Sequence, residues 1–169
     1  ACGAVTIEDG LSDHEFADVA STFGVDFADD HRAFLAAGVP VGPGWPNWRA
    51  GGRALSAQRR LPVDGILFAV EWKQFWDERW GVRPVRMKHA LRSAAYQLAR
   101  VPQMVPVYAN GYLPAGDPPG QPVLSIYQDD IRIAGADLLD YIDRQFGGDQ
   151  PAGPPAVAAS VEFWSAHVR

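Results

Sequence analysis

The stretch that most constrains the fold of this chain runs from residue 103 to residue 146. It contains three short runs rich in apolar, β-branched and aromatic residues, a composition that favours strands. These runs are residues 104–108, 122–127 and 131–134. The Pro- and Gly-rich segment 114–120 predicts a loop between the first two runs, and Asp137 begins a helical pattern that reaches Phe146. The stretch therefore predicts a sheet followed by a helix.

Further helical patterns lie on both sides of this stretch. Ser12 and Glu15 have the spacing of a capping box, which predicts a helix over 12–23 that ends at Gly24. Asp29 or Asp30 is expected to cap a second helix that ends at Gly38. Helical patterns are also present over 53–60, 71–80, 88–100 and 157–168, whereas 63–70 fits either a strand or a helix. The predicted fold class is α+β, with a small, mostly antiparallel sheet packed with N-terminal, middle and C-terminal helices.

The chain length of 169 residues is typical of one domain with a real hydrophobic core. We expect an N-terminal tail over 1–10, a single domain over 11–148, a Pro/Gly linker over 149–156 and a C-terminal helix over 157–169. Cys2 is the only cysteine, which excludes an internal disulfide framework.

Five of the six Trp residues lie between positions 45 and 80. Trp45 and Trp48 lie on the Pro/Gly-rich segment 39–52, which predicts a loop. They either plug the core or form a contact surface, and plugging is favoured because large aromatic side chains are mostly buried. The others in this region are Trp72, Trp76 and Trp80, which together with Phe75 have helical spacing and predict a core stripe.

The net charge of −5 conceals an uneven distribution. Residues 49–100 hold eleven basic and four acidic side chains, and the rest of the chain holds four basic and sixteen acidic ones. Either these segments neutralise one another, or one face is acidic and attracts a basic partner while it repels nucleic acid. No apolar run approaches the ~20 residues that span a bilayer, and the N-terminus lacks the features of a signal peptide. We expect a cytoplasmic protein that binds neither nucleic acid nor a membrane.

Motifs for catalysis, metals or cofactors are missing from the sequence. The four His residues, 14, 31, 89 and 167, have no metal-ligand spacing. Three of them lie on predicted helices among polar neighbours, where exposed or capping roles are expected. There is no GxSxG elbow and no phosphate-binding glycine loop. Accordingly, we predict no catalytic residue, no metal and no cofactor.

Asp129 and Asp130 form the one adjacent carboxylate pair near predicted strand ends. Paired carboxylates can transfer protons or hold a divalent cation. Neighbours along a strand point to opposite faces, however, so the favoured interpretation is that they stabilise a turn. The enzymatic alternative uses this pair with help from Tyr108 or His89.

The segments LSDHEFADVASTFG and DFADDHRAFLAAG resemble the opening of the SUKH superfamily, which includes yeast Smi/Knr-type cell-wall regulators and bacterial toxin-immunity proteins. The matching positions are Phe27, Asp30, Phe34, Leu35 and Gly38. Ala28 stands where the family usually has proline. The later segments PVDGILFAVEWKQFWDERWGVRP, VPVYANGYLP and PVLSIYQDDIRIAGADLLDYI are similar to those of an actinobacterial branch, so the resemblance covers roughly residues 11–146.

This resemblance implies an α+β protein-binding module without catalytic residues. In its more specific form it implies an immunity protein that neutralises a basic toxin domain. The residues we expect at a contact surface are Trp45, Trp48, Asp129 and Asp130, because loops and strand ends carry most binding residues. Two alternatives remain open: a small hydrolase or other enzyme, and a structural or regulatory subunit that buries its aromatic stripe on an obligate partner.

Overall fold

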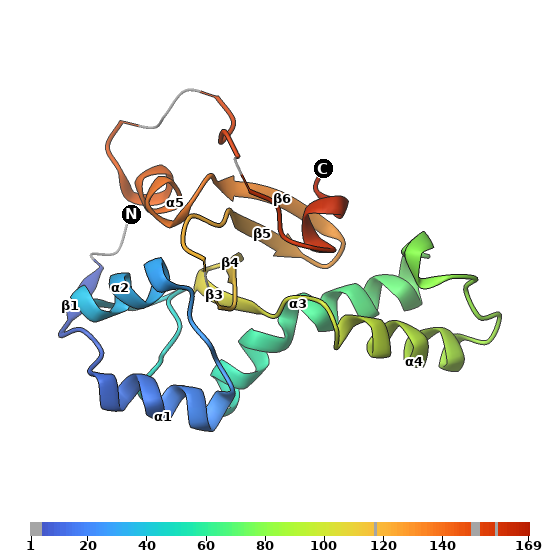
Figure 1. The fold of residues 1–169 in the computed structure, drawn as a ribbon, viewed down its shortest axis with the longest axis horizontal. Coiled ribbons are helices and arrows are strands. Elements are labelled where there is room, and N and C mark those ends of the chain that lie inside the picture. The colour runs from blue at the N-terminus through green and yellow to red at the C-terminus, as the bar shows by residue number, and fades with distance from the viewer. Residues whose placement is uncertain (1–4, 117, 150–152, 158) are drawn as a thin grey trace.

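Residues 5–116, 118–149, 153–157 and 159–169 are described by the structure, a computed structural model (Figure 1). Its α-helices are α1 (Asp13–Phe23), α2 (Asp29–Ala37), α3 (Gly52–Trp72), α4 (Met87–Leu98) and α5 (Leu138–Phe146), and its short 3-10 helices are η1 (Glu78–Trp80) and η2 (Trp164–His167). Its strands are β1 (Thr6–Glu8), β2 (Val39–Val41), β3 (Met104–Tyr108), β4 (Gly111–Pro114), β5 (Val123–Tyr127) and β6 (Asp130–Gly135). The predicted α+β class is confirmed. Cys2 lies outside the described residues.

The main sheet has four antiparallel strands in the order β3-β4-β5-β6. The three predicted strands and the helix after Asp137 are confirmed, and the Asp137 side chain caps α5 by accepting from the Asp140 N–H at 2.8 Å. The sequence missed β4, a four-residue strand that begins at Gly111 and ends at Pro114. Such a short run, bounded by two residues that usually interrupt strands, has too little pattern to be recognised.

A second, two-stranded sheet joins β1 to β2, with Glu8 opposite Val39 and Thr6 opposite Val41. The sequence assigned these residues to a tail and a loop, so both assignments need correction. Pairing with a distant segment, rather than any local pattern, makes them strands.

The first helix follows the sequence prediction closely. The Ser12 hydroxyl accepts from the Glu15 N–H, the Glu15 carboxylate accepts from the Ser12 N–H, and Gly24 ends α1 with a φ of 64°. The prediction for α2 is wrong in one detail, because its N-cap is Ala28, which makes no side-chain hydrogen bond. Asp29 and Asp30 lie in its first turn instead, where the helix dipole favours negative charge.

Helix α3 unites two segments that the sequence treated separately. Pro62 lies inside it and lacks the N–H that would bond to the Gln58 carbonyl one turn earlier. The Tyr112 hydroxyl, from β4, donates to that carbonyl at 3.4 Å. A tertiary contact thus satisfies the group that proline leaves unpaired, which allows one helix of 21 residues.

Two other predicted helices are wrong. The predicted helix over 71–80 does not form, because α3 ends at Trp72. The chain turns at Gln74, whose φ is 59°, and then enters η1. Over 157–168, the described residues form η2, a 3-10 helix, and no α-helix. Part of the predicted linker, residues 150–152, lies outside the described residues.

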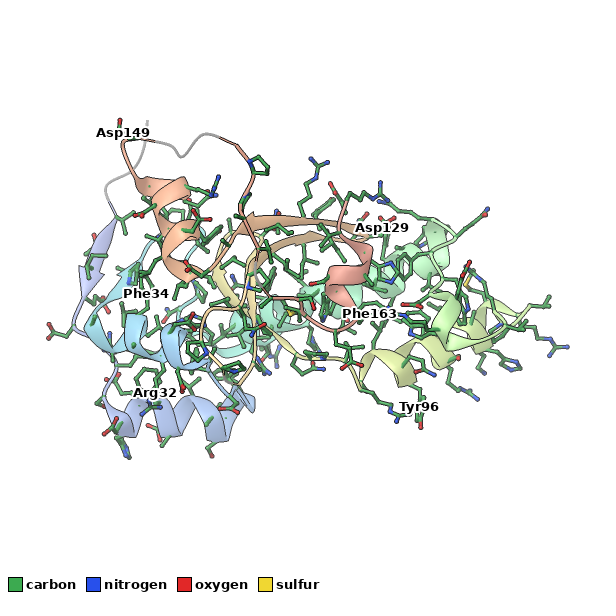
Figure 2. The ribbon with its side chains drawn as sticks, turned by 45° about the horizontal axis from the view of Figure 1, so that its top comes forward. Arg32, Phe34, Tyr96, Asp129, Asp149 and Phe163 are labelled. Carbon is green, nitrogen blue, oxygen red and sulfur yellow. The ribbon has the colours of Figure 1, made fainter. Side chains whose placement is uncertain are left out.

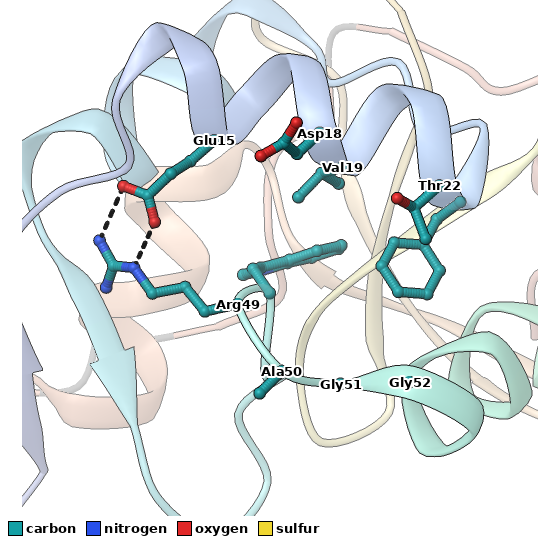
Figure 3. A pocket seen from close by; sticks show the side chains of 10 residues that line it. Glu15, Asp18, Val19, Thr22, Arg49, Ala50, Gly51 and Gly52 are labelled. Carbon is teal, nitrogen blue, oxygen red and sulfur yellow. Dashed lines mark hydrogen bonds and ion pairs between the residues drawn. The ribbon is translucent and has the colours of Figure 1, made fainter.

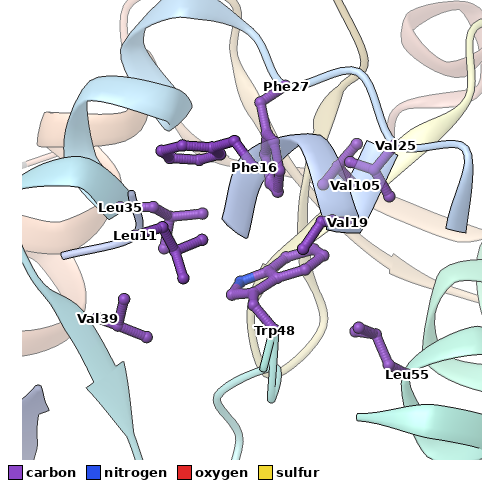
Figure 4. Packing of buried hydrophobic residues seen from close by; sticks show 10 residues of the cluster. All are labelled: Leu11, Phe16, Val19, Val25, Phe27, Leu35, Val39, Trp48, Leu55 and Val105. Carbon is purple, nitrogen blue, oxygen red and sulfur yellow. The ribbon is translucent and has the colours of Figure 1, made fainter. Parts of the chain in front are cut away.

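Helices cover both faces of the main sheet. On one face, Ile66 of α3, Leu124 and Ile126 of β5, and Trp164 of η2 share one buried cluster. On the other face, α5 packs onto the sheet through a second cluster whose members are Val107, Leu113, Val123, Leu138 and Tyr141. A third cluster joins α1, α2, β2 and the start of α3 (Figure 4). Beyond the sheet, the end of α3 and the whole of α4 form an arm that extends along the long axis (Figure 1).

Candidate functional site

Trp45 and Trp48 are mostly withdrawn from the surface. Trp48 is 4% exposed and lies in the N-terminal cluster, with its ring centroid 4.9 Å from that of Phe27 (Figure 4). Trp45 is half-buried between the rings of Tyr108 and Phe146. The favoured interpretation, that they plug the core, is therefore confirmed for Trp48, and neither side chain presents a broad contact surface.

Asp129 and Asp130 lie at the turn between β5 and β6, and they pair with different cations. Asp129 accepts from Lys73 and Arg169, both at 3.1 Å. Asp130 accepts from Arg132 at 3.0 Å, and this guanidinium holds the pKa of Asp130 below its usual range. The two carboxylates therefore act as turn and ion-pair residues in this structure and do not converge on a shared site.

His31 departs from the expected exposed or capping role. It is 1% exposed, and its ring meets that of Phe27 edge to face at 5.0 Å. Burial lowers the pKa of His31 to about 3, because an imidazolium would lose its hydration there. His31 is accordingly a neutral core residue.

One surface hollow, about 300 Å³, lies between α1 and the segment before α3 (Figure 3). Arg49 at its rim donates to both oxygens of Glu15, at 2.6 and 3.3 Å, to Glu8 at 3.1 Å, and to the carbonyls of Asp9 and Gly10. The hydrogen bonds from Arg49, with one from the Ser12 N–H, lower the pKa of Glu15 to about 2. The charged side chains of this hollow thus pair with one another, and their ion pairs connect β1, α1 and the segment that carries Trp48.

We expect Arg49→Ala to lower the midpoint of thermal unfolding, because it removes these ion pairs. Arg49→Lys should lower it less, because lysine keeps the positive charge but lacks the planar guanidinium that bonds both oxygens of a carboxylate. Glu15 has a lowered pKa in the folded state, so its contribution is present above about pH 4.5 and is lost as the pH falls toward 2. The difference between wild type and Arg49→Ala should therefore shrink over that range. A difference that stays constant from pH 7 to pH 2 would contradict this role. Thermal unfolding followed by circular dichroism measures both effects.

A second hollow, about 320 Å³, lies beside η1 and the C-terminal segment. Asp77 at its edge is 4% exposed and binds Arg79 at 2.6 Å and His167 at 2.9 Å. These hydrogen bonds, with that of Arg79 the largest cause, hold the pKa of Asp77 well below its usual range. The group ties η2 to the irregular segment after α3, which is a structural task.

A third hollow, about 280 Å³, has a more apolar lining and lies between α3 and the end of the β5–β6 hairpin. Leu61, Phe68 and Tyr127 line it and are 54%, 43% and 61% exposed. Gly65 lets the helix approach the hairpin, because a Cβ there would lie 2.9 Å from the Cα of Gln128. Close contact at Gly65 thus places the apolar side chains of α3 and β5 around one depression.

Trp72 continues this surface at the end of α3, where it is 68% exposed. Leu61, Gly65, Phe68 and Trp72 are spaced at i, i+4, i+7 and i+11, which is one face of a helix. We call Leu61, Phe68, Trp72 and Tyr127 the α3 apolar face. The sequence analysis missed it because Pro62 divided the pattern and Trp72 was assigned to a core stripe.

Within the described ranges, no three His, Cys, Asp or Glu side chains gather in a way that could hold a metal ion. Among the helices that the structure describes, none combines the length and apolar character needed to cross a membrane. Comparison with known proteins gave no matching family model and no significant match among curated proteins or solved structures. The SUKH resemblance therefore stays a prediction from the sequence.

Proposed function

We propose that this chain is a protein-binding module that docks its partner on the α3 apolar face. The observation that carries the proposal is the exposure of four large side chains: Leu61, Phe68 and Tyr127 line one hollow, and Trp72 follows on the same face of α3. Trp and Tyr are among the residue types that dominate binding energy. Single exposed apolar residues are common on protein surfaces, whereas a grouped patch marks an interaction site.

The charges beside this face favour a basic partner. Asp64 lines the hollow and Glu71 directly precedes Trp72, the last residue of α3; both are exposed. Lys73, the nearest cation after Trp72, is bound to Asp129. Arg60, next to Leu61, balances the charge of only one of the Asp64 and Glu71 carboxylates. A partner with apolar side chains flanked by Lys or Arg fits this arrangement.

We expect the double substitution Trp72→Ala and Tyr127→Ala to weaken capture of the physiological partner at least tenfold, about the loss that one hot-spot residue causes. Both side chains are more than half exposed, so the variant should unfold at nearly the wild-type temperature. The measurement is affinity capture from source cells by the tagged chain, followed by quantitative mass spectrometry. The matched control is Leu139→Ala, an apolar residue 70% exposed on α5.

The informative proteins are those captured equally by wild type and Leu139→Ala. Their loss from the double variant supports the proposal, and their retention contradicts it. The more specific proposal, an immunity protein, is tested by their identity. A basic toxin domain supports that form, and a partner of another class overturns it while leaving the docking surface intact.

The enzymatic alternative receives no comparable support. Asp129 and Asp130 are engaged by separate cations, Tyr108 packs against Trp45 and Phe146, and His89 is exposed on α4. The obligate-subunit alternative required a continuous exposed stripe. Of its residues, Phe75, Trp76 and Trp80 are half-buried against α3, α4 and the C-terminal segment, while Trp72 belongs to the α3 apolar face.

A further inference from the structure

The loop at the far end of the α3–α4 arm carries two fully exposed valines. Val82 is 95% exposed and Val85 is 103% exposed, more than any other large hydrophobic residue that the structure describes. Met87 follows at 38%. The loop lies at one extreme of the long axis, away from the main sheet (Figure 1). These side chains stabilise nothing within the chain, and their exposure costs solubility unless something covers them.

The part of the arm that follows Glu78 is strongly basic. Residues 79–100 contain six basic side chains and no acidic one. Arg79 is bound to Asp77, and Arg83 donates to the carbonyls of Val70 and Phe75. The four others, Arg86, Lys88, Arg92 and Arg100, form no ion pair with the described residues and are exposed.

Two of these cations lie on the outer face of α4, and Arg100 follows two residues after the helix ends. Lys88, Arg92 and Tyr96 recur every four residues, on the side of the helix opposite the buried Ala90, Ala94 and Leu98. Tyr96 is 62% exposed and points away from the body of the molecule (Figure 2), with the Arg100 guanidinium 5.6 Å from its ring centroid. A basic helix face with an amphipathic aromatic residue thus leads to an apolar tip.

We propose that this arm docks on an anionic membrane surface, with Val82 and Val85 in the headgroup–acyl boundary and the cations of α4 against the phosphates. Peripheral membrane segments combine these two features, apolar side chains that enter the interface and Lys/Arg that attract anionic lipid. Nucleic acid would use the cations but give the valines no role, because a valine neither stacks on a base nor donates a hydrogen bond. A two-valine tip is also small for a stable protein interface, which needs about 800 Å² from each partner.

The acidic part of the chain does not cancel this attraction. Residues 5–37 hold eight acidic side chains and one Arg, and they form the opposite end of the molecule (Figure 1). Helix α3 alone separates the two ends by about 30 Å, at ~1.5 Å per residue, whereas exposed charges are screened within about 8 Å at physiological salt. The charge distribution therefore orients the arm toward an anionic surface and the acidic end away from it.

Co-sedimentation of the purified chain with vesicles tests the proposal. We expect binding to vesicles of 70% phosphatidylcholine and 30% phosphatidylglycerol, little binding to pure phosphatidylcholine, and release by 0.5 M NaCl. Arg86→Gln with Lys88→Gln should weaken binding roughly 30-fold, at about fivefold for each cation. Val82→Ser with Val85→Ser should weaken it at least about tenfold. All four side chains are exposed, so folding should be unaffected.

The matched controls are Arg53→Gln and Leu139→Ser, an exposed cation and an exposed apolar residue outside the arm, which should bind as wild type does. Absence of binding to the anionic vesicles overturns the proposal. Binding that the Val82→Ser/Val85→Ser variant leaves unchanged also overturns it. Competition between the vesicles and a 30-nucleotide single-stranded DNA would then assign the cations to nucleic acid. Tyr127→Ala changes the α3 apolar face outside the arm and should leave vesicle binding intact, so failure of the membrane proposal and failure of the α3 apolar face are distinguishable.

Discussion

Replacing Trp164 with alanine is expected to lower the free energy of unfolding by about 3–5 kcal/mol, the cost of deleting a fully buried Trp side chain. Trp164 is 0% exposed and lies in the cluster that joins α3, the main sheet and the C-terminal segment. Its ring meets Phe163 edge to face at 5.1 Å, and its Nε1–H donates to the Pro102 carbonyl at 2.9 Å. The substitution therefore opens a cavity and removes a partner from a carbonyl at once.

Urea unfolding followed by circular dichroism measures this loss. Trp164→Phe should fall between wild type and Trp164→Ala, because it restores most of the apolar volume but not the hydrogen bond. Trp72→Ala is the matched control: Trp72 is 68% exposed, and its removal should change the free energy of unfolding by no more than about 0.5 kcal/mol. Equal losses for the two Trp→Ala variants would show that the C-terminal segment does not complete the core.

Stability is expected to fall in acid because His31 is buried in its neutral form. Its pKa is about 3 in the folded chain, against an ordinary value of 6.5. Between these values the unfolded chain binds a proton at His31 that the folded chain does not, so the unfolded state gains as the pH drops. The contribution of His31 to the free energy of unfolding is thus complete above about pH 6.5. It declines by up to about 1.4 kcal/mol per pH unit toward pH 3.

His31→Leu removes this proton and should flatten the dependence of stability on pH between 6.5 and 3. His89→Leu is the control, because His89 is exposed on α4, and it should keep the wild-type slope. Glu15 and Asp77 also lose stabilising charge in acid, so the informative quantity is the difference in slope between the two variants. Urea unfolding at several pH values gives that slope. Parallel curves for His31→Leu and wild type would contradict a neutral, buried His31.

Local chemistry made part of the fold predictable. The Ser12–Glu15 capping box, Gly24 after α1, the β-branched runs of β3, β5 and β6, and the Asp137 cap of α5 each act within a few residues, and each appears in the structure. The doubt about Asp129 and Asp130 was also justified. Asp129 lies in the turn and Asp130 begins β6, and they pair with different cations: Asp129 with Lys73 and Arg169, and Asp130 with Arg132.

The candidate site was predicted less well. The expected contact residues were chosen because they lie on loops and turns, but burial of Trp48 and the aromatic packing of Trp45 withdraw both rings from the surface. Exposure of Phe68 and Tyr127 depends on how α3 crosses the sheet, which the contact between Gly65 and Gln128 sets. Such a contact joins residues 63 positions apart and has no signal in local spacing.

The sequence by itself determined the α+β class, the capped helices and the strands of the main sheet, because hydrogen bonds and steric preferences between near neighbours specify them. Only the tertiary structure decided that α3 continues through Pro62, where Tyr112 supplies the missing donor, and that 71–80 turns back instead of remaining helical. It also decided that His31 is buried and Trp72 exposed. Burial depends on which distant segments pack together, and that information is spread over the whole chain.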